Sequence, residues 1–299
     1  MKYAIGLDIG ATKIRGVVAN ENGKILIRRE IETKAKRKKA AILSNIINAV
    51  IFLKKYAEKK SLKLAGIGIG APGIIKKGKF IFGGGTLSQF KGFDIANYIK
   101  KETGLKTLAD NDAKLFALAE SFFGAGKNYN RVAGIIWGTG IGSGFIDKKK
   151  KTARQMEIGH LVVEPNIKNE PKCGCGARGC VENLASGKNI IRRYYVKGGK
   201  IKNAEVKEIY HSKEKVAKEV LEDAYKYLGL GISVLIRAVR PEVVVFGGGV
   251  SNLPEAAHKK LRKYILNYAP AAASKIRIVK SKIGNFSGAL GAASLVFGK

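Results

Sequence analysis

Residues 3–20 read YAIGLDIGATKIRGVVAN, two apolar stretches separated by a short turn at Gly10. The mixture of branched apolar residues and glycine predicts two β-strands, and a glycine at the turn allows the chain to reverse tightly. Residues 132–147, VAGIIWGTGIGSGFID, repeat this pattern. Because each strand–turn–strand unit is followed by helical segments, the sequence predicts two related α/β halves with a cleft between them.

The elements around these units alternate between the two periodicities. Helices are expected at 38–60, 93–104, 113–124, 213–238, 254–268 and 287–297, and further strands at 24–32, 64–73, 105–110, 243–249 and 275–281. For the second helix, Asp94 is a predicted N-terminal cap and Gly104 a predicted stop.

The composition indicates a soluble enzyme with an unusual charge. The chain has 299 residues, with 56 Lys plus Arg against 23 Asp plus Glu, which gives a net charge of +33. Such a balance favours phosphates and nonspecific binding to nucleic acid, but no nucleic-acid-binding motif accompanies it. No apolar run approaches the roughly 18 residues of a membrane span. We expect a cytoplasmic protein with no specific nucleic acid and no membrane as partners.

The two glycine turns have the chemistry of phosphate-binding loops. Glycines let backbone N–H groups approach phosphate oxygens closely, and threonine hydroxyls and a lysine add donors and charge. The first loop offers Asp8, Gly10, Thr12 and Lys13; the second offers Gly138, Thr139, Gly140 and Gly142. In the first, Asp8 is placed to hold Mg²⁺ through water. A third cluster, Gly248 and Gly249, follows a buried strand and is a candidate floor for a nucleotide base or ribose.

Carboxylates form the next group of candidates. Asn111 and Asp112 stand where a strand ends and a helix begins, so the helix N-terminus favours an ionised Asp112. Phosphoryl transfer needs a base that accepts the proton of the attacking hydroxyl, a role that suits Asp112, while Asn111 can bond neighbouring sugar hydroxyls. Glu157 and Glu182 could accept hydrogen bonds from paired sugar hydroxyls; as isolated glutamates they would simply lie on the surface.

The three cysteines predict a metal site. His160 precedes Cys173, Cys175 and Cys180, and this set provides a complete tetrahedral shell for a structural Zn²⁺. A redox cysteine cluster and an iron–sulfur site are the alternatives. The remaining histidines, His211 and His258, lie among charged residues and are expected to be solvated.

Taken together, these motifs resemble the ROK family of sugar kinases and sugar-responsive repressors, and most closely its zinc-containing glucokinases. The resemblance rests on motifs that occur in family order over nearly the whole chain: DIGATKIRG, GAPG, DNDAKLFALAE, GTGIGSG, EIGH, CGCGARGCVENLASG and RPEVVVFGGGVS. It implies an α/β, two-domain actin-like, hexokinase-type ATPase fold with an interdomain cleft, in a homodimer or tetramer. The smaller domain would comprise 1–112 and 285–299, and the larger, zinc-binding domain 113–284.

The resemblance also assigns roles. ATP and Mg²⁺ would bind at the glycine loops, with Gly248 and Gly249 near the adenosine, and Asp112 would be the catalytic base. The sugar would bind to Asn111, Asp112, Glu157, His160 and Glu182, with His160 also on the zinc. The implied reaction is phosphorylation of a hexose, glucose to glucose 6-phosphate in the first place.

Alternatives remain open at the substrate. In the stretch GGGTLSQFKGF at 83–93, an asparagine that the family usually carries is missing, and Thr86 or Ser88 is the candidate replacement. N-acetylmannosamine, N-acetylglucosamine or fructose could replace glucose, and ADP or polyphosphate could replace ATP. A sugar-responsive transcriptional regulator is the alternative outside the enzyme class.

Overall fold

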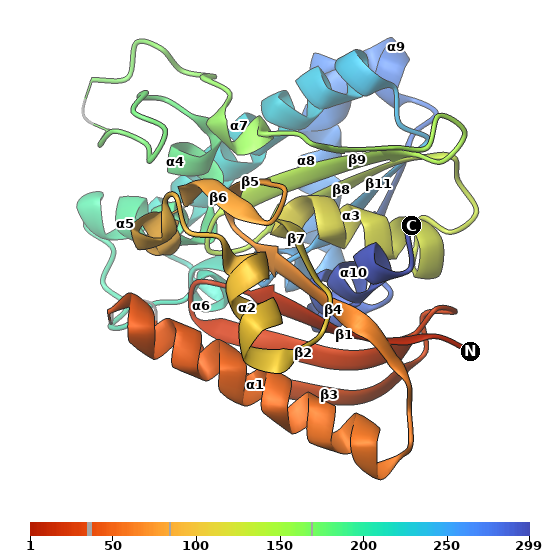
Figure 1. Cartoon of the computed structure of the whole chain (residues 1–299). Coiled ribbons are helices and arrows are strands. Elements are labelled where there is room, and N and C mark those ends of the chain that lie inside the picture. The colour runs from red at the N-terminus through yellow and green to blue at the C-terminus, as the bar shows by residue number, and fades with distance from the viewer. Residues whose placement is uncertain (35–37, 84, 169) are drawn as a thin grey trace. The chain divides into compact units, whose positions relative to one another are not determined.

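The N-terminal strand–turn–strand unit forms the middle of a five-stranded sheet in the computed structural model of the chain (Figure 1). The structure describes residues 1–34, 38–83, 85–168 and 170–299, without the side chains of 85 and 86. Its contacts divide the chain into unit 1, Met1–Lys127 with Lys282–Lys299, and unit 2, Asn128–Ser281.

Unit 1 has the sheet order β3-β2-β1-β4-β7, in which β1, β4 and β7 are parallel. Its strands are β1 (Tyr3–Ile9), β2 (Lys13–Asn20), β3 (Ile25–Glu32), β4 (Leu64–Ala71) and β7 (Thr107–Asn111), with a separate hairpin of β5 (Gly73–Lys76) and β6 (Lys79–Gly83). Its helices are α1 (Lys39–Lys59), α2 (Ile95–Thr103), α3 (Asp112–Phe123) and α10 (Ser287–Val296), with short turns η1 (Gly85–Phe90) and η4 (Gly284–Phe286).

The two faces of the unit 1 sheet differ in side-chain size. Ile5 and Leu7 face a core that includes Ile46 and Val50 of α1. On the opposite face, Gly6 leaves the backbone of β1 bare, and α10 packs so closely that an added Cβ would lie 1.9 Å from the carbonyl oxygen of Ala289. This alternation of large and small residues lets one helix approach the strands directly.

Helix α1 is long and apolar enough to cross a membrane by length and composition alone. Seven of its residues are nevertheless buried, among them Ile42, Ile46, Val50 and Leu53 of the unit 1 core. It is therefore a core helix of this unit.

Unit 2 has the sheet order β10-β9-β8-β11-β12, with β8, β11 and β12 parallel. Its strands are β8 (Arg131–Trp137), β9 (Ile141–Asp147), β10 (Thr152–Gln155), β11 (Val243–Gly247) and β12 (Arg277–Lys280). Its helices are α4 (Val181–Ala185), α5 (Gly187–Val196), α6 (Val206–His211), α7 (Lys215–Val239), α8 (Glu255–Tyr268) and α9 (Pro270–Ala273), with turns η2 (Ile158–His160) and η3 (Val250–Asn252). Alternate residues of β8 and β11, including Trp137 and Phe246, lie in one core with α7 and α8.

The contacts place α3 in unit 1, whereas the sequence prediction assigned residues 113–127 to the second domain. The physical reason is Glu120, which is fully buried on α3. Its carboxylate accepts hydrogen bonds from the backbone of Lys282 and Ile283 and, at 2.8 Å, from the Ser287 hydroxyl at the start of α10. These bonds connect α3 to the C-terminal segment that completes unit 1.

Candidate functional site

Two carboxylates lie close together in unit 1, at the carboxyl ends of parallel strands. Asp8 is near the end of β1 and Asp112 follows β7. The pKa of Asp8 is raised from 3.8 to about 7, mainly because its carboxylate is removed from water and also because the Asp112 carboxylate is near, while Arg15 opposes the shift. Asp112 is half-buried and accepts a hydrogen bond from the Ala113 N–H at 2.8 Å, in the first turn of α3. A buried acid beside a second acid is an arrangement that a divalent cation relieves.

Gly288 is a functional-site residue that the sequence prediction missed. A Cβ at this position would lie 2.5 Å from Oδ2 of Asp8, so the first turn of α10 approaches the carboxylate as only glycine permits. The sequence signal was present, because Gly288 stands in a helix built almost entirely of small residues. What was absent was any sign that this helix packs on β1.

The first glycine loop is held in shape by hydrogen bonds to its backbone. The Gly10 N–H donates to the Lys13 carbonyl at 2.9 Å, and the Thr33 hydroxyl donates to the Gly10 carbonyl at 2.7 Å. Thr12 is exposed, as a phosphate donor must be. Lys13 forms an ion pair with Glu30 of β3, so its ammonium has a protein partner. Thr33 was not predicted, and it fixes the turn from a neighbouring segment.

Asn111 caps α3. Its Oδ1 accepts from the Lys114 N–H at 3.0 Å, and its Nδ2 donates to the Gly73 carbonyl at 3.1 Å. Only 4% of the residue is exposed, so the predicted sugar ligand is also a structural cap. Of the two candidates for the missing asparagine, Ser88 is exposed in η1, and the side chain of Thr86 lies outside the described residues.

The second glycine loop, in unit 2, is fastened to the segment that starts α5. The Gly187 N–H donates to the Gly138 carbonyl at 2.8 Å, and the Gly138 N–H donates to the Gly140 carbonyl at 3.0 Å. A Cβ on Gly187 would also lie 2.8 Å from the Gly138 oxygen. Thr139 contributes its own carbonyl, which accepts from the Lys188 N–H at 3.3 Å. The loop is thus held through its backbone.

The third glycine cluster lies beside this loop. Gly138 is placed so that an added Cβ would be 3.7 Å from the Gly249 nitrogen. Gly248 has a φ of 91°, and a Cβ there would lie 2.5 Å from the Trp137 carbonyl, which explains why glycine stands at this position. The two clusters therefore meet at the carboxyl ends of the parallel strands β8 and β11, where ligands bind in sheets of this kind.

His258 corrects a prediction, because it is buried instead of solvated. Only 8% of it is exposed, and its Nε2 lies 2.8 Å from the Ser251 carbonyl in η3, directly after Gly249. Burial lowers the pKa of the imidazole. The charged residues around His258 in the sequence occupy other faces of α8, whereas His258 packs on Phe246.

Glu182 connects the second glycine loop to the cysteine segment. It stands in the first turn of α4, two residues after Cys180, and its Oε2 accepts a hydrogen bond from the Ile141 N–H at 3.1 Å. The predicted sugar ligand is thus half-buried and in direct contact with the loop. Gly142, the last predicted glycine of this loop, comes directly after Ile141 and lies in β9.

Glu157 and His160 form a pair at the start of η2. The distance between Glu157 Oε2 and His160 Nε2 is 3.6 Å, and Gln155 donates to the other carboxylate oxygen. Gly159 lies between them, and a Cβ there would be 2.4 Å from the Ile141 carbonyl. The EIGH motif needs its glycine because the turn packs directly on β9.

The other ring nitrogen of His160 faces the cysteines. Nδ1 lies 3.4 Å from Cys173 Sγ, and the ligand atoms of His160, Cys173 and Cys175 all lie within 4.8 Å of one another. Cys180 is outside that mutual set, although its Sγ lies 3.6 Å from Cys175 Sγ. Sulfur and imidazole donors at these separations suit a tetrahedral Zn²⁺, so the donor set fits the metal.

A buried ionic cluster, which the sequence prediction missed, holds the cysteine segment in place. Glu170 is 8% exposed and pairs with Arg192 and Arg193 of α5. Arg193 continues to Asp223 of α7 at 2.8 Å. A buried carboxylate is stable only when paired, so these contacts fix one end of the segment against two helices.

Comparisons with known proteins identify the family and the fold. The profile of the ROK family matches residues 4–299. A glucokinase of Thermotoga maritima is 30% identical over 98% of this chain and 96% of its own length, and an N-acetyl-D-glucosamine kinase of Haemophilus influenzae is 28% identical over 98% and 99%. The crystal structure of a ROK glucokinase from Streptomyces griseus, in complex with glucose and AMPPNP, has a TM-score of 0.84 at 26% identity and covers 99% of this chain and 100% of its own. The fold is the two-domain, actin-like α/β fold of hexokinase-type proteins.

Proposed function

The chain belongs to the ROK family, and we propose that it is a sugar kinase that transfers the terminal phosphate of ATP to a hydroxyl of a hexose, glucose before the others. The observation that carries the proposal is the pair of carboxylates in unit 1. Asp112 stands at a helix N-terminus beside the half-buried Asp8, whose pKa is raised to about 7. One acid is thereby available as a base and the other as a ligand for a cation.

Asp112 is the proposed catalytic base. The N-terminus of α3 favours its ionised form, in which it accepts the proton of the attacking hydroxyl. Asp8 would help to hold Mg²⁺, which when bound supplies the positive charge that phosphoryl transfer requires. Backbone N–H groups of the two glycine loops, with Thr12 and Lys13, are proposed to hold the phosphates, and Gly248 and Gly249 to lie against the adenosine.

The proposed sugar-binding residues are Asn111, Asp112, Glu157, His160 and Glu182. The placement of His160 supports a double role, because one ring nitrogen faces Cys173 and the other faces Glu157. A ring held by a metal at Nδ1 presents Nε2 in one orientation. The cysteine segment would then order the sugar-binding side chains without entering the chemistry.

A sugar panel tests the proposal. In an assay that couples ADP release to NADH oxidation, we expect the highest kcat/KM with glucose, compared with N-acetylglucosamine, N-acetylmannosamine and fructose, and with ATP compared with ADP and polyphosphate. Asp112→Asn should lower kcat by about 10³-fold while the protein stays folded. Asp110→Asn is the matched control, because it removes a carboxylate two residues away that pairs with Lys114; its kcat should change by less than about threefold.

Each outcome of that assay decides a part of the proposal. Preference for an N-acetylhexosamine would retain the kinase assignment and replace glucose as the substrate. Preference for ADP or polyphosphate would replace ATP as the phosphate donor. Equal activity of Asp112→Asn and the wild type would reject Asp112 as the base. Absence of phosphorylation with every sugar would reject the enzyme in favour of a sugar-responsive regulator.

The zinc site has its own test. His160→Gln should reduce bound zinc, measured by inductively coupled plasma mass spectrometry, from about one ion per chain to a small fraction of that. His211→Gln is the control, because His211 is exposed in α6 and meets the ring of Tyr210 edge to face. Wild-type protein that carries no zinc after purification in zinc-containing medium would contradict the assignment.

A further inference from the structure

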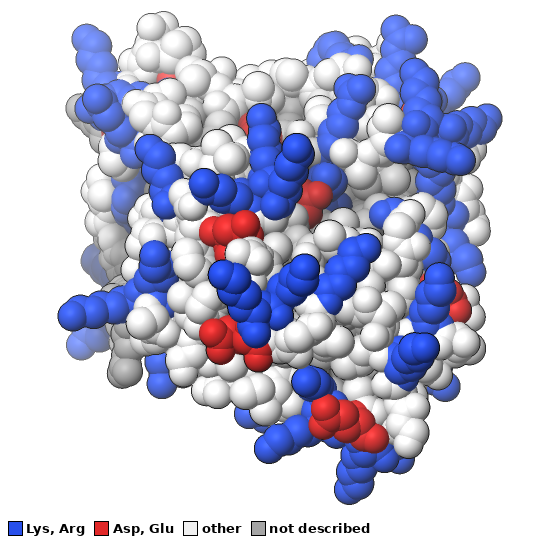
Figure 2. Space-filling model, viewed as in Figure 1, with Lys and Arg blue, Asp and Glu red and all other residues white. Residues whose placement is uncertain are grey.

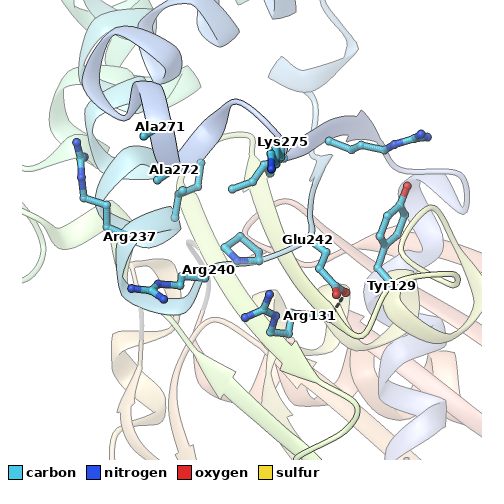
Figure 3. Close-up of a pocket in the computed structure, with 12 residues that line it drawn as sticks. Tyr129, Arg131, Arg237, Arg240, Glu242, Ala271, Ala272 and Lys275 are labelled. Atoms are coloured by element: carbon cyan, nitrogen blue, oxygen red, sulfur yellow. Dashed lines mark hydrogen bonds between the residues drawn. The ribbon is translucent and has the colours of Figure 1, made fainter.

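Unit 2 has a second candidate site, at the end of its sheet opposite to the glycine loops (Figure 3). A cavity of about 900 Å³ is lined by Arg131, the first residue of β8, by Glu242, just before β11, and by Arg277, the first residue of β12. The glycine loops follow the other ends of β8 and β11. Because β8 has seven residues, the two places are about 20 Å apart along the strand.

The cavity is strongly positive. Five basic side chains line it, and Glu242 is the one acid among its lining residues; the basic ones are Arg131, Arg237, Arg240, Lys275 and Arg277. Basic side chains cover much of the face seen in Figure 2, and most basic residues of the chain are lysines, whereas four of the five cations of the cavity are arginines. Guanidinium groups bind phosphate oxygens in a bidentate way that ammonium groups do not match.

The Glu242 carboxylate is held by backbone N–H groups, without a salt bridge to the cations of the cavity among the described residues. Oε2 of Glu242 accepts the backbone N–H groups of Asn130 at 2.6 Å and Arg131 at 3.0 Å, and these bonds, the one from Arg131 first, lower its pKa. Within the described part of the chain, none of the five cations forms an ion pair; Arg237 donates to the Tyr268 carbonyl. By contrast, Arg192 and Arg193 in the same unit are paired with acids.

The walls combine this charge with apolar surface. Figure 3 shows Arg131, Arg240 and Glu242 on one side and Ala271, Ala272 and Lys275 on the other. Arg240 ends α7 in the left-handed conformation, with φ at 44°. That position is usually taken by glycine, so an arginine there indicates a use for its side chain.

A smaller hollow of about 430 Å³ continues the positive surface. It shares Arg131 and Glu242 with the first and adds three cations, Lys149, Lys150 and Arg154, and one acid, Asp147. A ligand that extends from one hollow toward the other would meet cations along its length. A single phosphate could not neutralise so many charges, whereas a chain of phosphates could.

We propose that this cavity binds a small molecule that carries a chain of two or more phosphate groups, at a site separate from the glycine loops. The volume suits a small molecule, and the arginines supply the forks for successive phosphates. The proposal does not depend on the kinase assignment, because it rests on residues at the opposite end of the sheet.

Tripolyphosphate is the probe for the test, by isothermal titration calorimetry at 150 mM NaCl. Arg131→Gln/Arg277→Gln should weaken binding at this site by 20-fold or more, and the number of bound tripolyphosphates per chain should fall by one. The control Lys207→Gln/Lys218→Gln removes the same charge from exposed positions of α6 and α7. Its affinity should stay within twofold of the wild type.

A second double variant distinguishes the charge of the arginines from the geometry of their guanidinium groups, and it keeps the test valid if the Gln pair fails to fold. Arg131→Lys/Arg277→Lys retains both charges and loses both forks, and we expect it to weaken binding three- to tenfold. Titration with pyrophosphate and with ADP compares a bare phosphate chain with one that carries a nucleoside. If ADP binds more tightly and Arg131→Gln/Arg277→Gln abolishes that binding, the ligand is a nucleotide. Equal affinity of the wild type and the Gln pair, equal weakening by the control pair, tighter binding of duplex DNA than of tripolyphosphate, or no binding to the wild type would each overturn the proposal.

Discussion

The two glycine loops share one strand–turn–strand frame and differ in how they are held. The loop of unit 1 contains the half-buried Asp8 and is fastened by the Thr33 hydroxyl. The loop of unit 2 contains no charged residue between Gly138 and Gly144 and is fastened through its backbone to Gly187 and, by Glu182, to the cysteine segment.

This difference indicates that the two strand–turn–strand units have different roles. In unit 1 the loop places charge, so its substitutions should act on the chemical step and on its pH dependence. In unit 2 the loop has no charged residue of its own, and Glu182, which supports it, is the carboxylate that we propose to bind sugar. Its substitutions should therefore act on binding, and through Glu182 on two ligands at once.

Of the substitutions that compare the two loops, the largest effect is expected at Asp8. Asp8→Asn should lower kcat about 100-fold, because the proposed ligand for the cation is lost. The same change should stabilise the metal-free protein at pH 8. Burial and Asp112 raise the pKa of Asp8 from 3.8 to about 7 in the folded chain, so the folded chain holds this proton more tightly than the unfolded one. Its stability therefore falls as pH rises from about 4 to about 7, and the penalty is complete above 7.

Thermal unfolding in EDTA measures that penalty. At pH 8 the Asp8→Asn protein should be more stable than the wild type by about 4 kcal/mol, and the difference should shrink as the pH is lowered toward 4. Asp112→Asn is the internal comparison, because it removes the neighbouring charge and leaves the burial; its pH slope should be smaller than that of the wild type but not zero. A difference between Asp8→Asn and wild type that is the same at every pH would refute the charged-loop interpretation.

A smaller effect, on binding, should distinguish the second loop. Glu182→Gln keeps an oxygen for the Ile141 N–H and removes the charge, so the sugar KM should rise about tenfold while the nucleotide KM stays within twofold. Glu182→Ala removes the support as well and should raise both KM values. Steady-state kinetics with each substrate varied in turn gives the two numbers.

The matched control for Glu182→Gln is Glu205→Gln, which changes a capping glutamate at the start of α6. It should leave both KM values unchanged. If Glu182→Ala raised the sugar KM alone, the glutamate would bind sugar without supporting the loop. The claim that Glu182 holds the loop of unit 2 for nucleotide binding would then be wrong.

Local features of the fold were readable from the sequence because neighbouring residues decide them. The cap of α2 at Asp94 and its stop at Gly104, with φ at 72°, are confirmed. Long-range packing was not readable in the same way. Nothing near Glu120 in the sequence shows that its carboxylate binds residues more than 160 positions later, and that contact places α3 in unit 1.

The candidate site divides along the same line. His160, Cys173 and Cys175 were predicted from spacing, and the structure brings their ligand atoms together. Gly288 and Thr33 act at Asp8 and Gly10 from distant segments, so their roles required coordinates. Glu170 was overlooked because a lone glutamate in a loop has no pattern that predicts its burial between two arginines.

The smallest effect tests whether Thr33 supports a phosphate loop or only the fold. Thr33→Val removes the hydroxyl bond to the Gly10 carbonyl and keeps the shape of the side chain. The loss should cost about 1 kcal/mol of stability and raise the nucleotide KM two- to fivefold, with the sugar KM unchanged. Thr103→Val is the matched control, because its hydroxyl also donates to a backbone carbonyl at 2.7 Å, that of Ile99 in α2. Both variants should unfold at lower temperature than the wild type, and only Thr33→Val should bind nucleotide more weakly. Equal nucleotide KM values for the two variants would mean that the hydrogen bond from Thr33 to the charged loop contributes to stability alone.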